Sequence, residues 1–355
     1  MPVTFGRSNV DLLKAIHFLA WRNPPPPLAI TAEELIAITP QLLHLGAGAL
    51  AWRRIADSDL QDLPAALELK RAYQFHTLQT AVDELNLTRV FSDFRAAGIE
   101  PLLVKGWAIA RLYRDPAIRP FSDIDLIVQP QHTGKAREFL QNAWRYPINI
   151  DLHEELKDSD GQNVEAMFAR SQLINLNGTK IRVPCEEDHL RFLCLHALRH
   201  GIWRPLWLCD VAVALENRRA DFDWQSCLGD NQIQANWILS TIKLANQLLG
   251  AEINDTPVAE IKKPLPRWFV NAVLQNWQAA KGMKQISLNA IVLSNQFSFR
   301  EKLAELSYRW HRPIEASLDL QIPFNRLPRL PIQLAASLLR VPDFLDALAQ
   351  RLKNR

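Results

Sequence analysis

Two aspartates open an apolar run at Asp123-Ile-Asp-Leu-Ile-Val128. This alternation predicts a strand, and side chains two residues apart on a strand lie on the same face. Two such carboxylates can converge on hard divalent cations, which prefer oxygen ligands. Asp151, in the segment Ile148-Asn-Ile-Asp-Leu-His153, is the expected third carboxylate on a neighbouring strand. Asp123, Asp125 and Asp151 therefore predict a two-metal site of the kind used in phosphoryl and nucleotidyl transfer, with Mg²⁺ expected and Mn²⁺ also compatible.

A Lys-Gly pair precedes these aspartates, between an expected strand at residues 99–104 and an expected helix at residues 107–113. Backbone N–H groups at a helix N-terminus favour phosphate, so Gly106 is the expected phosphate-binding turn and Lys105 adds a cation. Arg119 lies four residues before Asp123 and is expected to reach the same phosphates. The segment thus predicts a site for a nucleoside triphosphate (NTP), with ATP as the first choice.

Three histidines are further candidates. His153 follows Asp151 by two residues and would contact phosphate or simply pack in the sheet. His196 and His200 are one helical turn apart and share a helix face, where they would line the nucleotide cleft or satisfy buried polar groups. An alternative reading joins these two histidines with Asp210 in a zinc or iron site.

The elements that must position these residues are mostly helical. The 355 residues are 48% hydrophobic and 22% charged, as in a soluble globular chain with more than one core. The 12 glycines are few for a turn-rich sheet fold, so the chain predicts an α+β fold with one modest mixed sheet. We expect an N-terminal helical region at residues 1–98, a catalytic core at 99–185 and a C-terminal helical domain at 186–355.

Several local signals fix the expected helices. Thr31-Ala-Glu-Glu34 is a capping-box pattern, and a long helix is expected from about Pro64 to Ala97, ended by Gly98. Further helices are expected at residues 131–144, at the amphipathic segment 188–200 and at the apolar segment 206–215. Residues 257–266 read as a loop between helices.

Composition limits the partners. The net charge of +3 is too weak to indicate a nucleic acid or a membrane, and no window approaches the roughly 18 apolar residues of a membrane span. No Cys-x-x-Cys pair is present among the four cysteines, so a zinc knuckle is not expected. The sequence shows no signal-peptide cleavage pattern and no membrane span, so a cytoplasmic, reduced location is the default expectation. RNA binding is a less favoured alternative, based on basic and aromatic residues near the C-terminus: Arg300, Arg309, Trp310, Arg312, Arg326 and Arg329.

The segments 103–113 and 119–128 together resemble the polymerase-β nucleotidyltransferase superfamily. More narrowly, they are similar to an uncharacterised nucleotidyltransferase family whose core reads Lys-Gly, a helix ending near Tyr, then Arg-Pro-x-x-Asp-Ile-Asp-Leu. AbiEii-type toxin nucleotidyltransferases are similar over the same stretch. Three downstream matches extend the resemblance to roughly residues 60–220: Asp151-Leu-His153, Leu195-His-Ala-Leu-Arg-His-Gly201 and Trp207-Leu-Cys-Asp210.

The resemblance implies a polymerase-β-type sheet and an enzyme that transfers a nucleoside monophosphate (NMP) from an NTP to an acceptor, with release of pyrophosphate. Asp123 and Asp125 would bind both metals, and Asp151 would bind one and orient or deprotonate the acceptor. The acceptor is left open among a small molecule, a peptide, a protein and RNA. Trp107 departs from the usual Ser or Gly of the superfamily and is expected to narrow the phosphate pocket.

Two other readings remain. One is a toxin-like transferase that acts on tRNA or protein, and the other is a catalytically inactive nucleotide-binding or interaction protein.

Overall fold

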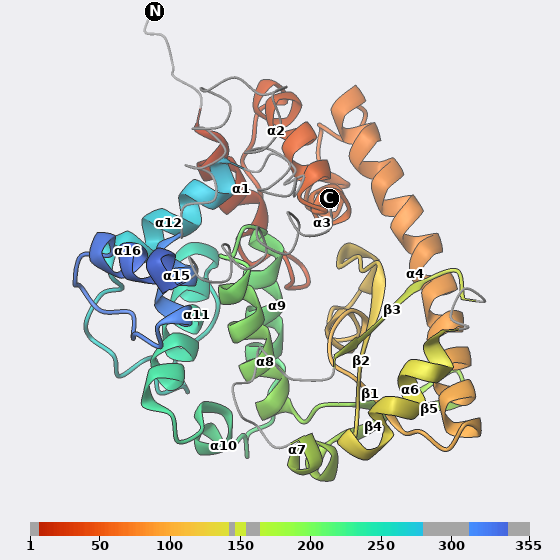
Figure 1. Ribbon diagram of the computed structural model, residues 1–355. Coiled ribbons are helices and arrows are strands. Elements are labelled where there is room, and N and C mark those ends of the chain that lie inside the picture. The colour runs from red at the N-terminus through yellow and green to blue at the C-terminus, as the bar shows by residue number, and fades with distance from the viewer. Residues whose placement is uncertain (1–6, 142–145, 154–163, 280–311, 340–355) are drawn as a thin grey trace, which may run out of the picture.

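The computed structural model describes residues 7–141, 146–153, 164–279 and 312–339. Helices surround one three-stranded and one two-stranded sheet (Figure 1). The predicted α+β class is therefore confirmed. Within these residues, no helix combines the length and the apolar character needed to cross a membrane. All four cysteines are buried and unbridged.

Four helices begin the chain: α1 (Asn9–His17), α2 (Ala32–His44), α3 (Gly48–Ile55) and α4 (Pro64–Ala96). The capping box before α2 is confirmed, because the Thr31 hydroxyl accepts from the Glu34 N–H and the Glu34 carboxylate accepts from the Thr31 N–H. The long predicted helix is α4, and it stops just before Gly98, whose φ is 69°. Glycine adopts this left-handed backbone conformation without the strain that a Cβ atom would add.

The larger sheet has the order β1 (Pro101–Leu103), β2 (Asp123–Val128) and β3 (Asn149–His153). β1 is antiparallel to β2, whereas β3 is parallel to β2, so the sheet is mixed as predicted. A parallel pair needs a crossover, and α6 (Thr133–Leu140) provides one here. The second sheet is the antiparallel hairpin of β4 (Gln172–Leu176) and β5 (Thr179–Val183).

Short elements connect these strands: α5 (Trp107–Ala110), the single-turn 3-10 helices η1 (Pro116–Ile118) and η2 (Pro130–His132), and α7 (Val164–Arg170). The helix expected at residues 107–113 is therefore one turn long. The helix expected at 131–144 is observed as α6 over eight residues, and positions 142–145 lie outside the described residues.

The C-terminal part adds α8 (Glu186–Arg199), α9 (Pro205–Glu216), α10 (Trp224–Leu228), α11 (Gln232–Leu249), α12 (Arg267–Gln278), α15 (Pro313–Asp319) and α16 (Leu330–Leu339). The expected helices at 188–200 and 206–215 correspond to α8 and α9. Residues 257–266 contain no helix, as predicted. Of the basic and aromatic residues considered for RNA binding, Arg300, Arg309 and Trp310 lie outside the described residues.

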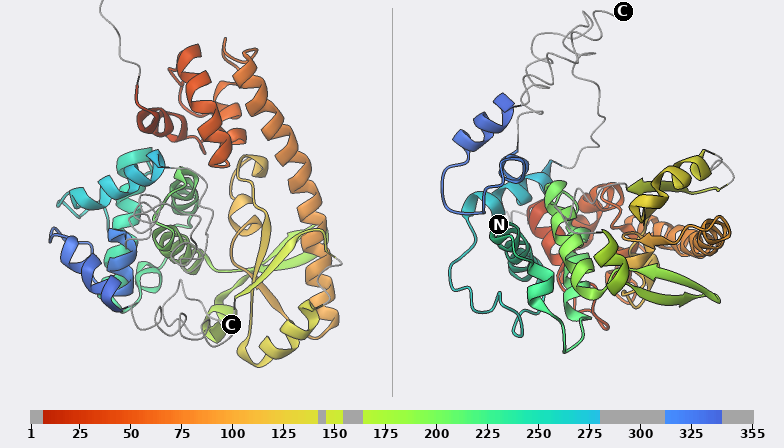
Figure 2. Two further views of the ribbon diagram at one scale, coloured as in Figure 1. Left: turned by 45° about the horizontal axis from the view of Figure 1, so that its top comes forward. Right: turned by 60° about the horizontal axis from the view of Figure 1, so that its bottom comes forward.

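Two main apolar cores organise the molecule. The larger core joins the N-terminal and C-terminal helices, and includes Leu12, Leu69, Leu208 and Trp277. The second core lies against the larger sheet, where Phe91 packs with residues of β2. α4 contributes to both cores, and it runs from the N-terminal helices along the sheet (Figures 1 and 2). This helix therefore holds the sheet against the helical part. The three domain ranges given above stay a prediction.

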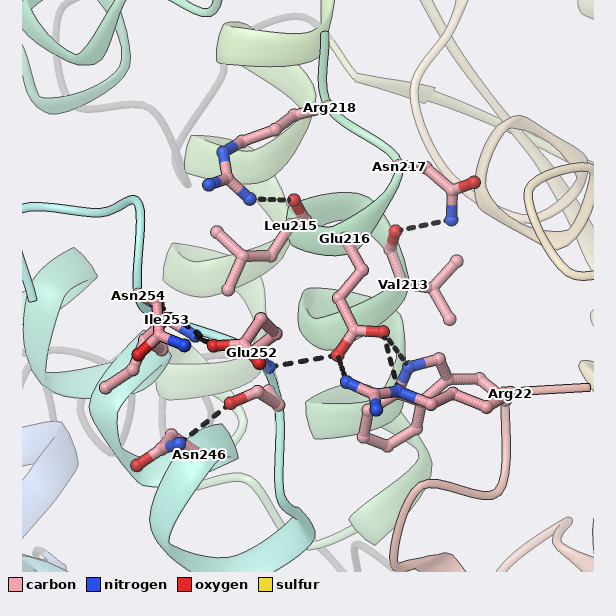
Figure 3. A network of polar contacts seen from close by, with 12 residues as sticks. Arg22, Val213, Leu215, Glu216, Asn217, Arg218, Asn246, Glu252, Ile253 and Asn254 are labelled. Atoms are coloured by element: carbon pink, nitrogen blue, oxygen red, sulfur yellow. Dashed lines mark hydrogen bonds and ion pairs between the residues drawn. The ribbon is translucent and has the colours of Figure 1, made fainter. Parts of the chain in front are cut away.

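A polar network around Glu216 fastens the segment after α1 to the end of α9 (Figure 3). Its carboxylate accepts hydrogen bonds from Trp21 Nε1 at 2.9 Å, from Arg22 Nη2 at 3.0 Å and from the backbone N–H of Glu252 at 2.9 Å. One side chain thus joins three segments that are distant in sequence.

Glu216→Ala should lower the free energy of unfolding by about 1–3 kcal/mol, because donors on three residues, Trp21, Arg22 and Glu252, lose their acceptor. Urea denaturation measures this change. Glu68→Gln is a matched control, since Glu68 is exposed on α4. Equal stability of both variants would show that the network contributes nothing.

Candidate active site

The pairing of β2 with β3 brings the predicted carboxylates together. Asp125 is directly opposite Asp151 in the register, and Asp123 is opposite Asn149. The predicted adjacency of the two strands is therefore confirmed. Ligand atoms of Asp125, Asp151 and His153 all lie within 4.8 Å of one another, close enough to hold one metal ion. Asp123 precedes Asp125 by two residues on β2 and lies outside this group of three.

Asp125 is the most buried carboxylate of the site, and two positive or hydrogen-bonding groups meet at its Oδ1 atom. Lys105 Nζ donates to it at 2.9 Å and His153 Nε2 at 2.7 Å. Burial raises the pKa of Asp125, but the hydrogen bond from His153 and the charge of Lys105 oppose burial more strongly. Its pKa therefore lies below the ordinary value.

Asp123 has the opposite electrostatic balance. Burial, and next the negative charge of Asp125, raise its pKa above the ordinary value. Neighbouring carboxylates repel one another in this way wherever no cation separates them. The donor set fits a divalent cation, because two carboxylates offer oxygen ligands and a bound ion would relieve the repulsion at Asp123. The ion would then replace the ammonium of Lys105 as the positive partner of Asp125.

The turn at Gly106 depends on glycine. Its φ of 57° and ψ of −115° are rarely adopted by other residues. A Cβ atom here would lie 3.2 Å from the Asp123 carbonyl oxygen and 3.3 Å from the Phe121 ring. The turn is thus packed directly on the start of β2. The helix that follows, α5, has four residues, so its dipole is small. The expected phosphate binding at this turn stays a prediction.

Trp107 is a buried core residue, and its expected effect on the phosphate pocket stays a prediction. Its side chain is part of the core between α4 and the sheet, and its Nε1 atom donates to Glu84 Oε1 at 2.9 Å. The large residue at this position therefore anchors the turn to α4.

Arg119 is engaged in a buried ion pair. Its Nε and Nη2 atoms donate to the Asp210 carboxylate at 3.0 and 2.7 Å, and its Nη1 atom donates to the Pro120 carbonyl at 2.9 Å. Tyr113 also donates to Asp210, at 2.8 Å. Arg119 thus fastens the loop before β2 to α9 in this structure. Its expected role at the phosphates stays a prediction.

The zinc or iron alternative at His196, His200 and Asp210 is wrong for the described residues. Asp210 is 1% exposed, and both its oxygens accept hydrogen bonds from Arg119. The three side chains do not form a metal-binding group there.

His196 and His200 instead belong to an aromatic cluster formed by α8 and α9. The His196 ring is stacked on Phe192 at 6.1 Å, and its centroid is 5.3 Å from that of Trp207. His200 lies 4.6 Å from His196. Lys105 Nζ is 5.7 Å from the centre of the Phe192 ring, so the cluster begins beside the carboxylates.

Arg204, the residue just before α9, is a candidate site residue that the sequence patterns do not identify. Its guanidinium lies 4.5 Å from the centre of the Trp203 ring and interacts electrostatically with Asp123. The available signal was Trp203-Arg-Pro205, in which Pro205 indicates the start of a helix. That signal predicts where the helix begins, but it does not predict the direction of the arginine side chain.

A family model described as "uncharacterised nucleotidyltransferase" matches residues 38–250, more than half of the chain. The match includes the whole of both sheets together with α8 and α9. The chain therefore belongs to this family of nucleotidyltransferases. No curated protein and no solved structure matches the chain. The similarity to AbiEii-type toxins stays a prediction.

Gly106→Ala should lower the free energy of unfolding by about 1–3 kcal/mol, because alanine adds strain at a positive φ and a close contact with β2. Thermal and urea unfolding measure the loss. Gly134→Ala is the matched control, since nothing lies within 4 Å of its added Cβ. Similar stability of the two variants would contradict the packing described for this turn.

Arg119→Met and Asp210→Leu should each destabilise the protein by about 3–5 kcal/mol, because each leaves a buried charge without its partner. The double variant should recover part of this loss, and a double-mutant cycle in urea measures the coupling. Additive effects would mean that the pair is not coupled in solution.

Proposed function

We propose that this protein is a metal-dependent nucleotidyltransferase that transfers NMP from an NTP, with ATP the first choice, to an acceptor and releases pyrophosphate. The observation that carries the proposal is the register of Asp125 and Asp151 on parallel strands. It gathers two carboxylates and His153 within 4.8 Å, on the sheet of a chain that belongs to a nucleotidyltransferase family.

Asp123, Asp125 and Asp151 are the residues that would hold the divalent cations, with Mg²⁺ expected. When bound, these ions would stabilise negative charge on the attacking and leaving oxygens. The three carboxylates would fix the ions on one face of β2 and β3, because the strands are part of a packed sheet.

The transfer forms one bond and breaks one. An acceptor hydroxyl oxygen bonds to the α-phosphorus, and the bond from that phosphorus to the bridging oxygen breaks, so that pyrophosphate leaves with the electron pair. We assign removal of the hydroxyl proton to Asp151. Its side chain is 54% exposed, in contrast to 4% for Asp125, so an incoming acceptor can reach it.

Lys105 and His153 would adjust the charge of the site. Both contact Asp125 Oδ1 in this structure. Cation binding by Asp125 would release the Lys105 ammonium, whose flexible chain would then be free to bind phosphate. His153, hydrogen-bonded to one carboxylate and 3.5 Å from the other, would keep both carboxylates oriented.

Asp125→Asn should reduce turnover by at least about a hundredfold, because the variant loses a charge at the metal site while it keeps the shape of the side chain. The assay incubates the protein with Mg²⁺, α-labelled NTPs and a cell extract, and follows both label transfer and pyrophosphate. Asp57→Asn, an exposed aspartate between α3 and α4, is the control.

The same assay separates the other readings. Label on tRNA or protein would identify a toxin-like transferase. NTP binding without turnover would identify an inactive nucleotide-binding protein, and no binding of Mg–NTP at millimolar concentration would exclude the proposal.

A further inference from the structure

Three cations interact electrostatically with Asp123: Lys105, Arg119 and Arg204. Two of these cations already form ion pairs with protein carboxylates. Lys105 forms an ion pair with Asp125, and Arg119 forms one with Asp210. In the part of the chain that the structure describes, the Arg204 side chain makes neither a hydrogen bond nor an ion pair.

Arg204 is held in place by aromatic rings rather than by acceptors. Its guanidinium carbon is 4.5 Å from the centre of the Trp203 ring and 5.9 Å from that of Trp207. Its Nε atom is buried without a partner. Burial lowers the pKa of Arg204, and the charge of Arg119 lowers it further, yet an arginine stays charged at neutral pH.

Burial of the Nε atom without a partner costs stability, since no hydrogen bond replaces the water that burial removes. Such a cost is commonly retained where a side chain serves a ligand. Among the described residues, Arg111 likewise has a buried Nε atom and no side-chain hydrogen bond. Its electrostatic interactions are with Glu186 and His189, whereas those of Arg204 include Asp123. Aromatic rings also connect Arg204 to the proposed metal site. Its guanidinium lies over Trp207, and the Trp207 ring contacts His196. His196 is stacked on Phe192, and Lys105 lies over Phe192. Among the described residues, Arg204 is thus a cation near this site that forms neither a hydrogen bond nor an ion pair.

We propose that Arg204 binds the β- and γ-phosphates of the NTP, the part that leaves as pyrophosphate. The proposal rests on the transferase function proposed above. Carboxylates repel a triphosphate, so its far end needs a cation that no protein carboxylate already holds. The planar guanidinium offers N–H donors in a fork that matches two phosphate oxygens. Trp203, on which the guanidinium lies, restricts its orientation.

The test measures binding of three probes by calorimetry in the presence of Mg²⁺: ATP, inorganic pyrophosphate and AMP. Arg204→Ala should weaken ATP and pyrophosphate binding by about tenfold to a hundredfold, and AMP binding by less than about twofold. Arg204→Lys should recover part of the loss, because it restores charge without the planar fork. Arg218→Ala is the matched control, since Arg218 lies over Trp224 beyond the other end of α9. Its guanidinium donates to the Leu215 carbonyl (Figure 3) and to the Asp255 carbonyl.

Thermal unfolding distinguishes a ligand-binding role from a structural one. Without ligand, Arg204→Ala should melt at the wild-type temperature or above it, because the variant loses an unpaired charge. Its stabilisation by Mg–ATP should be smaller than that of wild type. A lower melting temperature without ligand, together with unchanged ATP affinity, would overturn the proposal and leave Arg204 a packing residue.

The two proposals fail in different ways. Wild-type ATP affinity and turnover in Arg204→Ala would overturn this inference alone, while the transferase function would stand. An equal loss of ATP and AMP binding would also overturn it, because the arginine would then not recognise the leaving phosphates. Absence of Mg–NTP binding by the wild-type protein would remove both proposals together.

Discussion

The parallel pairing of β2 with β3 forces acidic side chains together. The register sets Asp125 opposite Asp151, and the two-residue repeat of a strand adds Asp123 on the same face of β2. This arrangement is unfavourable without positive charge, which explains why the pKa of Asp123 is raised by burial and by Asp125. It also explains why Lys105 and His153 both contact Asp125. The remaining polar features of the site can be understood as responses to this repulsion.

The ion pair of Arg119 with Asp210 fastens the helical part to the segment that leads into these carboxylates. Arg119 immediately precedes the loop into β2, and Asp210 lies on α9, so the pair connects the start of the strand to that helix. Arg204 precedes the same helix. A buried pair of this kind adds little net stability, because the cost of removing both charges from water offsets their attraction. The pair nevertheless fixes the start of β2 relative to the helix that Arg204 precedes.

Local patterns made the fold and part of the site predictable. The capping box at Thr31, the strand at Asp123–Val128 and the strand that carries Asp151 depend on neighbours in sequence, and the structure contains all three. Arg119 was predictable as a residue near the site, but its partner is 91 positions away. Spacing contains no information about such a contact. The direction of the Arg204 side chain was unpredictable for the same reason, because it depends on the packing of Trp203 and Trp207.

The charges of the site couple the metal to the nucleotide. Arg119 and Asp210 neutralise each other, so the three carboxylates outnumber the two remaining cations, Lys105 and Arg204, by one. A site with this charge would repel a triphosphate. In the proposed function, one divalent cation would reverse the sign and would also free Lys105 from Asp125, so that Lys105 and Arg204 would both become available to phosphate. Binding of the metal and binding of the NTP would then favour each other, and the carboxylates that create the repulsion would make nucleotide binding depend on the ion.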